Sequence, residues 1–347
     1  MAKPDFPQAA KKRRISRLAV ALPFLVFFAG AAEPPMPATT LRQDEILRAL
    51  ESNRPEWDAA PGIWMLGRWN MDEGLERLFP FPTGKGNAAS RFRLLDDAFP
   101  EEKDVLETAG EDSRGVRALL EAAEMAECRL TPEYYPEFVS ADNRQPDSGV
   151  YGRYLVALLR RADRAERGGD SGEAERCYRA AILCGRHLTN DKYSFTVFNI
   201  GLIFKLYGAR GYAAFLERTG RRDRAGDAEG YLDKVQTYAT LFRWKIDLLN
   251  MTGEFDALPA IVRIAADDSE VFWRKEALVR LSTLRFGIPD LEEKTVLRNP
   301  VFEKAADDAL SAAASRDPDP SVRRFALWLV QNVRPEGYAA MEHKFMP

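Results

Sequence analysis

The spacing of apolar residues along the chain is helical from residue 40 onward. Apolar side chains recur every three or four positions in one segment after another, without the strict alternation that is typical of a half-buried strand. Proline and glycine separate these segments, as in the stretch 80–84. The pattern predicts helices over 41–51, 63–78, 90–98, 114–129 and 149–167. We therefore expect an all-α fold.

A proline-rich stretch divides the predicted helices into two groups. Residues 131–148 contain Pro132, Pro136 and Pro146 together with three aromatic residues. Proline cannot continue a helix, so this stretch predicts a connection. The sequence thus predicts an N-terminal helical region over 40–148, followed by a second group of helices.

Glycines mark the turns in this second group. Gly169, Gly208 and Gly253 each lie between two amphipathic segments. Because glycine ends helices at low steric cost, each of them predicts the turn of an antiparallel helix pair. The polar stretch 223–230 predicts an inserted surface loop.

Two segments here resemble helices of tetratricopeptide repeats. Residues 172–181, GEAERCYRAA, are similar to the second helix of that repeat, and residues 198–208, FNIGLIFKLYG, to its first helix and turn. The predicted turns are 39 and 45 residues apart, whereas the family repeats every ~34 residues. The resemblance implies drifted repeat units over about 149–266.

The C-terminal segments resemble HEAT repeats. Residues 317–329, DPDPSVRRFALWL, are similar to the second helix of such a repeat, with Asp319 as its cap and Pro320 in its first turn. The segment 301–315 supplies the partner helix, and 268–281 with 255–266 forms an earlier, weaker copy. The resemblance implies HEAT-like units over 267–335, before a tail over 336–347.

Both resemblances imply a right-handed α-solenoid of stacked antiparallel helix pairs, since a pair buries its apolar face only against the next pair. In tetratricopeptide domains the first helix of each unit lines the concave face. This implies a face that binds a protein or peptide, formed by Phe195, Phe198, Asn199, Leu202, Lys205, Arg243, Trp244 and Asp247. Ordinary packing between helices is the alternative role for Phe195, Phe198 and Trp244. Basic and amide side chains are too few here to predict a carboxylate clamp.

Residues 1–31 have the layout of a secretory signal. Basic residues between 11 and 17 precede an apolar run over 18–29, and Ala29-Gly30-Ala31 supplies small residues for cleavage. A proline-rich linker over 32–39 follows. An uncleaved membrane anchor is the alternative, although the run is shorter than the ~20 residues that span a bilayer. We expect an exported protein, periplasmic or anchored in the inner membrane and facing the periplasm.

The charge balance argues against a nucleic-acid partner. Residues 1–31 contain six basic and one acidic side chain out of 50 and 53, so the remaining chain has 44 basic and 52 acidic side chains and a net charge of −8. A duplex binder needs a basic face that displaces counterions from phosphates. The expected partner is a protein or peptide, with membrane contact only through the possible anchor.

The sequence offers few groups for catalysis. The three cysteines, Cys128, Cys177 and Cys184, are too few for a disulfide scaffold, and we expect buried thiols, a bridge from Cys128 to either of the others remaining possible. His187 and His343 are far apart, and neither has a partner at metal-ligand spacing. We expect no metal and no cofactor, and for His187 a role at a helix C-terminus, where positive charge suits the dipole.

One enzyme alternative starts from Glu51 and Ser52, with Gly62-Ile63-Trp64-Met65 further on. This arrangement faintly resembles lytic transglycosylases, in which one glutamate is the general acid that cleaves peptidoglycan. Exposed polar residues at a helix end are the competing explanation for Glu51 and Ser52. The favoured hypothesis is a non-catalytic envelope adaptor, with a structural spacer as a further alternative. The sequence does not indicate the oligomeric state.

Overall fold

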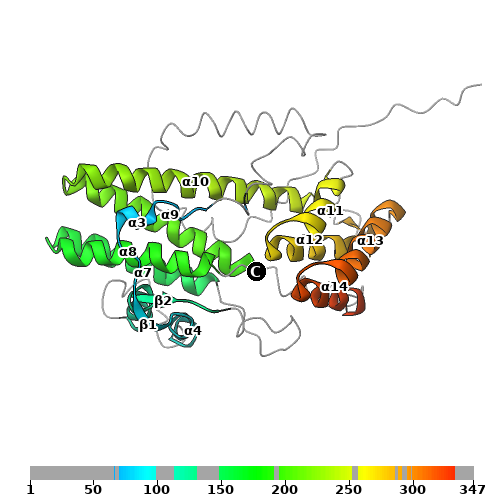
Figure 1. The fold of residues 1–347 in the computed structure, drawn as a ribbon, viewed down its shortest axis with the longest axis horizontal. Coiled ribbons are helices and arrows are strands. Elements are labelled where there is room, and N and C mark those ends of the chain that lie inside the picture. Colours follow the sequence, from blue (N-terminus) through cyan, green and yellow to red (C-terminus); the bar gives the residue numbers. More distant parts are fainter. Residues whose placement is uncertain are drawn as a thin grey trace, which may run out of the picture.

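The described part of the chain is mostly helical, which confirms the all-α prediction (Figure 1). The computed structural model describes residues 66, 70–98, 113–130, 148–190, 195–251, 257–285, 288–290, 295–297 and 299–332. It also contains two short strand pairs, β1 (Gly84–Asn87) parallel to β2 (Met125–Glu127) and β3 (Ile288–Asp290) antiparallel to β4 (Thr295–Leu297). Each strand has three or four residues. Strands of this length are too short to produce a recognisable alternation of apolar and polar residues in the sequence.

The N-terminal region contributes α3 (Leu75–Leu78), α4 (Ala89–Ala98) and α5 (Arg114–Ala123). The predicted helix over 63–78 is wrong at residues 71–74, which form a turn because Gly74 has a φ of 90° and the Asn70 side chain accepts a hydrogen bond from the Asp72 amide. Helix α5 ends before residue 129 because the chain passes into β2 and pairs with β1. Helix α5 packs against both α4 and α8.

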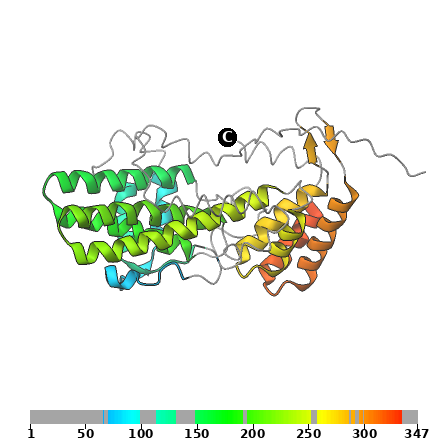
Figure 2. The same cartoon turned by 90° about the horizontal axis from the view of Figure 1, so that it is seen from above.

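Four long helices form the centre of the molecule: α7 (Ser148–Arg167), α8 (Ser171–Thr189), α9 (Phe195–Arg218) and α10 (Arg222–Asn250). They lie side by side and alternate in direction, with α8 packed on α7 and α9, and α10 on α9 (Figures 1 and 2). The predicted turn at Gly169 is confirmed. Its φ is 82°, and the Asp170 side chain accepts a hydrogen bond from the Glu173 amide at 3.0 Å. That bond begins α8.

The predicted turn at Gly208 is wrong, because α9 is continuous through this position. A Cβ atom on Gly208 would lie 2.9 Å from the Cβ of Ala181. Gly208 therefore permits a close approach of α8 and α9 rather than a change of direction. Gly185 and Gly201 act in the same way, since a Cβ on Gly185 would lie 2.7 Å from the Gly201 carbonyl oxygen.

The second turn lies at Gly220, which has a φ of 73° and follows Gly169 by 51 residues. The stretch 223–230 is consequently not an inserted loop but the first turns of α10. Ala225, Ala228 and Tyr231 are buried there at three-residue intervals. Two alanines among charged residues are a weak hydrophobic signal, which explains why the stretch looks like a loop in the sequence.

The C-terminal helices are α11 (Leu258–Asp267), α12 (Val271–Leu284), α13 (Pro300–Arg316) and α14 (Pro320–Asn332). Helix α11 packs on α12 and α13 on α14, while α11 also contacts α13 and α12 contacts α14. The predicted cap of α14 is confirmed, because Asp319 Oδ1 accepts a hydrogen bond from the Ser321 amide at 2.7 Å. The stripe of Val322, Ala326 and Leu329 is buried as predicted.

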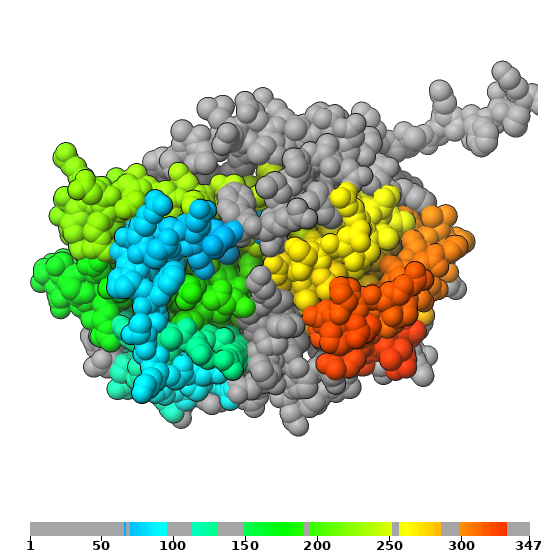
Figure 3. Space-filling view, in the orientation of Figure 1, coloured from blue at the N-terminus to red at the C-terminus, as the bar shows by residue number. Residues whose placement is uncertain are grey.

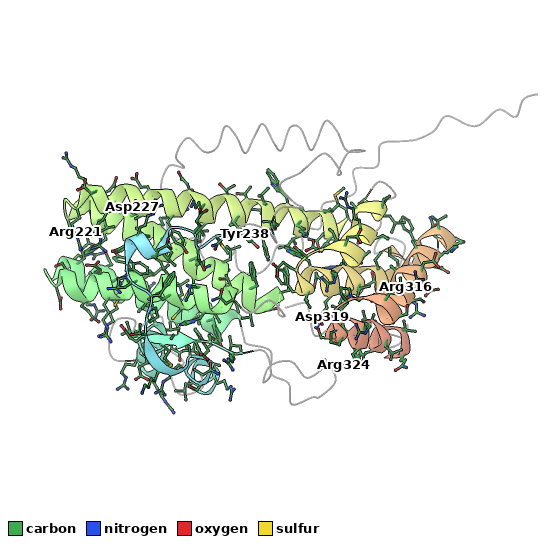
Figure 4. The ribbon with its side chains drawn as sticks, viewed as in Figure 1. Arg221, Asp227, Tyr238, Arg316, Asp319 and Arg324 are labelled. Carbon is green, nitrogen blue, oxygen red and sulfur yellow. The ribbon has the colours of Figure 1, made fainter. Side chains whose placement is uncertain are left out.

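Aromatic side chains connect the central helices with the C-terminal ones. We call this cluster the aromatic junction; it consists of Phe195 and Phe198 on α9, Tyr238 and Phe242 on α10, and Phe272 and Trp273 on α12. Tyr238 is labelled in Figure 4 near the middle of α10. Beside the cluster, Lys245 of α10 pairs with Asp268 in the turn before α12, and both side chains are buried.

None of the described helices is both long enough and apolar enough to cross a bilayer. Several predicted segments lie outside the described residues: the signal or anchor over 1–31, the linker over 32–39, the helix over 41–51, nearly all of the connection over 131–148, Gly253 and the tail over 336–347.

Candidate functional site

The residues of the predicted concave face do not form one exposed surface. Phe198, Leu202, Lys205 and Trp244 are buried, Phe195 and Asn199 are half-buried, and Arg243 and Asp247 are exposed. Arg243 and Asp247 lie one turn apart on α10. They are therefore the two members of the set that are accessible to a partner, whereas binding by the whole set stays a prediction.

Phe195 and Phe198 belong to the aromatic junction. The Phe198 ring lies 4.8 Å from that of Phe272 and 5.5 Å from that of Phe242, and the Phe195 ring lies 5.4 Å from that of Phe242. Stacked rings at these distances stabilise the packing of α9, α10 and α12. The contacts of these two rings agree with their alternative role, which is packing between helices.

Lys205 takes part in a different cluster, centred on Asp72. Its Nζ donates a hydrogen bond to Asp72 Oδ1 at 2.6 Å, and the Tyr231 hydroxyl donates to the same oxygen at 3.3 Å. Arg186 Nε lies 3.9 Å from Asp72 Oδ2. The four residues come from the turn before α3 and from α8, α9 and α10, so the Asp72 cluster holds four parts of the chain together.

Burial dominates the electrostatics of this cluster. Burial lowers the pKa of Lys205. The neighbouring Asp72 carboxylate acts in the opposite direction but does not cancel this effect. Burial also raises the pKa of Tyr231, and the negative charge of Asp72 raises it further, so Tyr231 remains a hydrogen-bond donor at neutral pH. The lysine side chain is 1 % exposed, and its amine is bonded to Asp72.

A polar cavity of about 280 Å³ opens in front of the cluster. It is lined by Asn70, Asp72, Glu73, Glu76, Phe81, Arg186 and Asn190. The segment carrying the first five of these runs across the central helices in Figure 3. The Arg186 guanidinium lies 4.1 Å from the centre of the Phe81 ring, a cation–π contact that holds it at the C-terminal end of α8.

The lining of this cavity is mostly charged and polar. Three carboxylates and one guanidinium line it together with two amides, so it offers hydrogen bonds to a polar group. The Asp72 carboxylate already accepts bonds from Lys205 and Tyr231, and Glu73 pairs with Lys234 at 3.5 Å. Two of the three carboxylates of the cavity therefore already interact with side chains of the protein itself.

His187 does not have the charge that its predicted role requires. It lies in the last turn of α8 as expected, but it is buried, and burial lowers its pKa to about 4, with the Arg186 charge lowering it further. The ring is therefore neutral at pH 7. The predicted charge–dipole contribution of His187 is wrong for this reason, and the half-buried Arg186 is the charged basic residue in this last turn.

Within the described ranges no group of three or more His, Cys, Asp or Glu side chains is arranged to hold a metal ion. Glu51, on which the transglycosylase alternative depends, lies outside the described residues, as does His343.

Sequence reasoning identified Lys205 as a site residue but missed Asp72, Arg186 and Tyr231. Asp72 is 133 residues from Lys205 and has no motif around it. Only a fold that brings the turn before α3 onto α9 joins the two residues. The signal available in the sequence was Lys205 itself, a charge within an apolar helix, which indicates a buried partner.

No family model, curated protein or solved structure matches this chain, so the geometry of the described residues is the basis for a proposal about its function.

Proposed function

We propose that this protein is an exported, non-catalytic scaffold, a right-handed α-solenoid that binds a protein or peptide partner in the cell envelope. One observation carries the proposal: helix pairs stack in succession, with α11 contacting α13 and α12 contacting α14. Such stacking is typical of α-solenoids, whose extended surfaces bind other chains. Export rests on the signal-like residues 1–31.

The buried charges support a structural role for the ionisable groups. Lys205 pairs with Asp72, Lys245 pairs with Asp268, and Arg274 of α12 pairs with Asp317 through two hydrogen bonds of 2.8 and 3.0 Å. Each pair joins two elements that are distant in sequence. Groups engaged in this way fix the packing of helices and are poorly placed for proton transfer to a substrate.

The exposed face of α10 is the proposed binding surface. α10 has 29 residues, is the longest described helix and contacts both the central and the C-terminal helices. Arg243 and Asp247 are exposed on this helix, and Arg243 directly follows Phe242 of the aromatic junction in the sequence. Charged groups at the rim of an interface select a partner mainly through complementary charge.

A charge exchange on α10 tests the proposal. Arg243→Asp combined with Asp247→Arg keeps the composition and net charge but reverses the pattern that a partner meets. We expect the tagged wild-type chain to co-purify with a stoichiometric partner after cross-linking in envelope extracts. The exchanged variant should bind that purified partner at least tenfold more weakly, as measured by titration calorimetry.

The matched control is the same exchange at an exposed pair on α7, Asp163→Arg with Arg167→Asp, which also lies four residues apart. This variant should bind as the wild type does, and both variants should keep the wild-type circular dichroism spectrum. Equal binding by both variants would contradict the α10 surface. A wild-type chain that elutes without any stoichiometric partner would contradict the scaffold itself.

A further inference from the structure

The turns before α12 and before α14 are built in the same way. In the first, the Asp268 carboxylate accepts a hydrogen bond from the amide two residues further on at 3.0 Å, and Arg274 Nη1 donates to the Asp268 carbonyl oxygen at 2.6 Å. In the second, Asp317 accepts the corresponding amide bond at 2.8 Å, and Arg323 Nη1 donates to the Asp317 carbonyl oxygen at 2.6 Å. The two aspartates are 49 residues apart, and so are the two arginines. One turn is therefore repeated at this interval.

In both turns a basic side chain from an earlier helix binds the aspartate carboxylate. Asp268 pairs with Lys245 of α10. Asp317 accepts two hydrogen bonds from Arg274 of α12, one from Nε at 2.8 Å and one from Nη2 at 3.0 Å, and both side chains are buried. Arg274 thus binds its own turn through Nη1 and the carboxylate of the next turn through its other two nitrogens.

Arg323 repeats the first half of this arrangement but not the second. Its Nη1 donates to the carbonyl oxygens of Asp317 and Pro318, at 2.6 and 3.2 Å. Among the described residues, no carboxylate pairs with its Nε or Nη2. Arg274 shows that an arginine in this position can hold a carboxylate by two parallel hydrogen bonds, which is a strong and geometrically specific contact.

The face of α14 that carries Arg323 also exposes apolar side chains. Leu327 and Val330 follow Arg323 by four and seven positions, so all three lie on one face of the helix, and they are 48 % and 37 % exposed. The equivalent residues of α12, Leu278 and Leu281, are fully buried where α12 packs against α11, α13 and α14. We call the face formed by Arg323, Leu327 and Val330 the terminal face.

Helices α13 and α14 form the end of the described helices that lies away from the central group (Figures 1 and 3). The terminal face is therefore the position where a further helix would continue the packing of α12 with its neighbours. The end repeats of such arrays need a polar outer face for solubility, so exposed Leu327 and Val330 are unusual there. Arg324, which is labelled in Figure 4, is exposed and adds a second positive charge beside Arg323.

We propose that the terminal face is a docking surface for an amphipathic helix of a partner protein, and that the turn before that helix presents an aspartate or glutamate to Arg323. Two observations identify this occupant: the unpaired positive charge of Arg323 is complementary to a carboxylate, and the exposed apolar stripe continues the interface that α12 makes. The inference rests on the proposed scaffold function for a protein partner in the cell. It concerns a second surface, which is independent of α10 and of export.

A peptide with the sequence of residues 315–332 is the probe, because this segment packs against α12 and binds Arg274 through Asp317. A hydrocarbon link between positions 327 and 331, both exposed on α14, holds the peptide helical and removes its own copy of the terminal face. Binding of the labelled peptide to the full chain is measured by fluorescence anisotropy. We expect saturable binding of one peptide to each chain.

Reversal of charge identifies the contact. Arg323→Glu in the chain should weaken binding about tenfold or more, and Asp317→Arg in the peptide should restore binding to this variant. Because Arg323 also binds the turn before α14, Leu327→Asp provides a second measurement at an exposed position, and it should weaken binding to a similar extent. Arg222→Glu in the first turn of α10 is the matched control; it changes the net charge equally and should bind as the wild type does.

All three variants should keep the circular dichroism spectrum of the wild type. Equal weakening by Arg222→Glu, or no recovery with the reversed pair, would overturn the proposal. The same holds for a wild-type chain without saturable binding, which is the result expected if residues 333–347 already cover the face. A wild-type dimer that Leu327→Asp converts into a monomer, as measured by analytical ultracentrifugation, would assign the face to a second copy instead. Specific peptide binding without any partner in envelope extracts would support the terminal face and contradict the scaffold function.

Discussion

At the scale of single residues, buried charge is the feature that most constrains this protein. Lys205 is fully buried, and the Asp72 carboxylate is the acceptor that its amine contacts. An ammonium group without a partner in the interior is strongly destabilising, whereas a paired one contributes little net stability. The protein can therefore bury Lys205 only because Asp72 pairs with it, although the pair itself adds little net stability.

Replacement of Asp72 should reveal this requirement. Asp72→Ala leaves Lys205 buried without its carboxylate and removes an acceptor of Tyr231, so we expect the free energy of unfolding to fall by about 3–5 kcal/mol in urea titrations. The control is Glu73→Ala in the same turn, whose side chain is 72 % exposed. Its effect should stay within about 0.5 kcal/mol. Equal effects of the two substitutions would show that Asp72 has no special role.

The lowered pKa of His187 should make the stability of the fold decrease as the solution becomes acidic. Its pKa is about 4 in the folded chain and about 6.5 when unfolded. At pH 7 both states are neutral, and His187 makes no contribution. As the pH falls through 6.5 the unfolded state gains a proton that the folded state does not bind. The free energy of unfolding should therefore decrease between pH 6.5 and 4, by about 3 kcal/mol in total from this residue.

Denaturant titrations at several pH values measure this effect. His187→Asn removes the titrating ring, so the difference in unfolding free energy between wild type and variant should change across this range and stay constant above pH 7. A constant difference from pH 7 down to pH 4 would mean that the folded His187 titrates normally.

At the scale of helices, glycine has two opposite roles in this chain. Gly169 and Gly220 adopt positive φ values and end helices. Gly185, Gly201 and Gly208 lie inside helices and allow α8 and α9 to approach closely. Both roles are compatible with the same residue type, because glycine lacks a Cβ atom in either case.

Alanine substitutions distinguish these roles. Gly208→Ala should destabilise the protein by about 1–3 kcal/mol, because the new Cβ would lie 2.9 Å from Ala181 and 3.0 Å from the Ile182 backbone nitrogen. Gly226→Ala on α10 is the matched control, since its Cβ would meet no atom within 4 Å. There the higher helix propensity of alanine should stabilise the protein by up to about 1 kcal/mol. Thermal unfolding of both variants measures the contrast, and destabilisation by both would contradict it.

At the scale of the whole molecule, the aromatic junction determines how the helix groups are joined. Rings from α9, α10 and α12 stack within one cluster, and Lys245 beside it lies 4.8 Å from the centre of the Trp273 ring. α10 and its contacts thus connect the central helices with α11–α14 (Figure 2). The charge exchange at Arg243 and Asp247 examines this long helix as a binding surface.

The sequence alone determined the helical class, the turn at Gly169, the cap at Asp319 and the buried stripe of α14, because these features depend on neighbours within a few residues. Tertiary structure decided the rest. Gly208 is a contact point rather than a turn because α8 packs against it, and Phe198 is an interior ring because α12 covers it. Lys205 has a partner because the chain brings Asp72 back from 133 residues away. Local patterns record helix periodicity, but they do not record which distant side chain will meet each face.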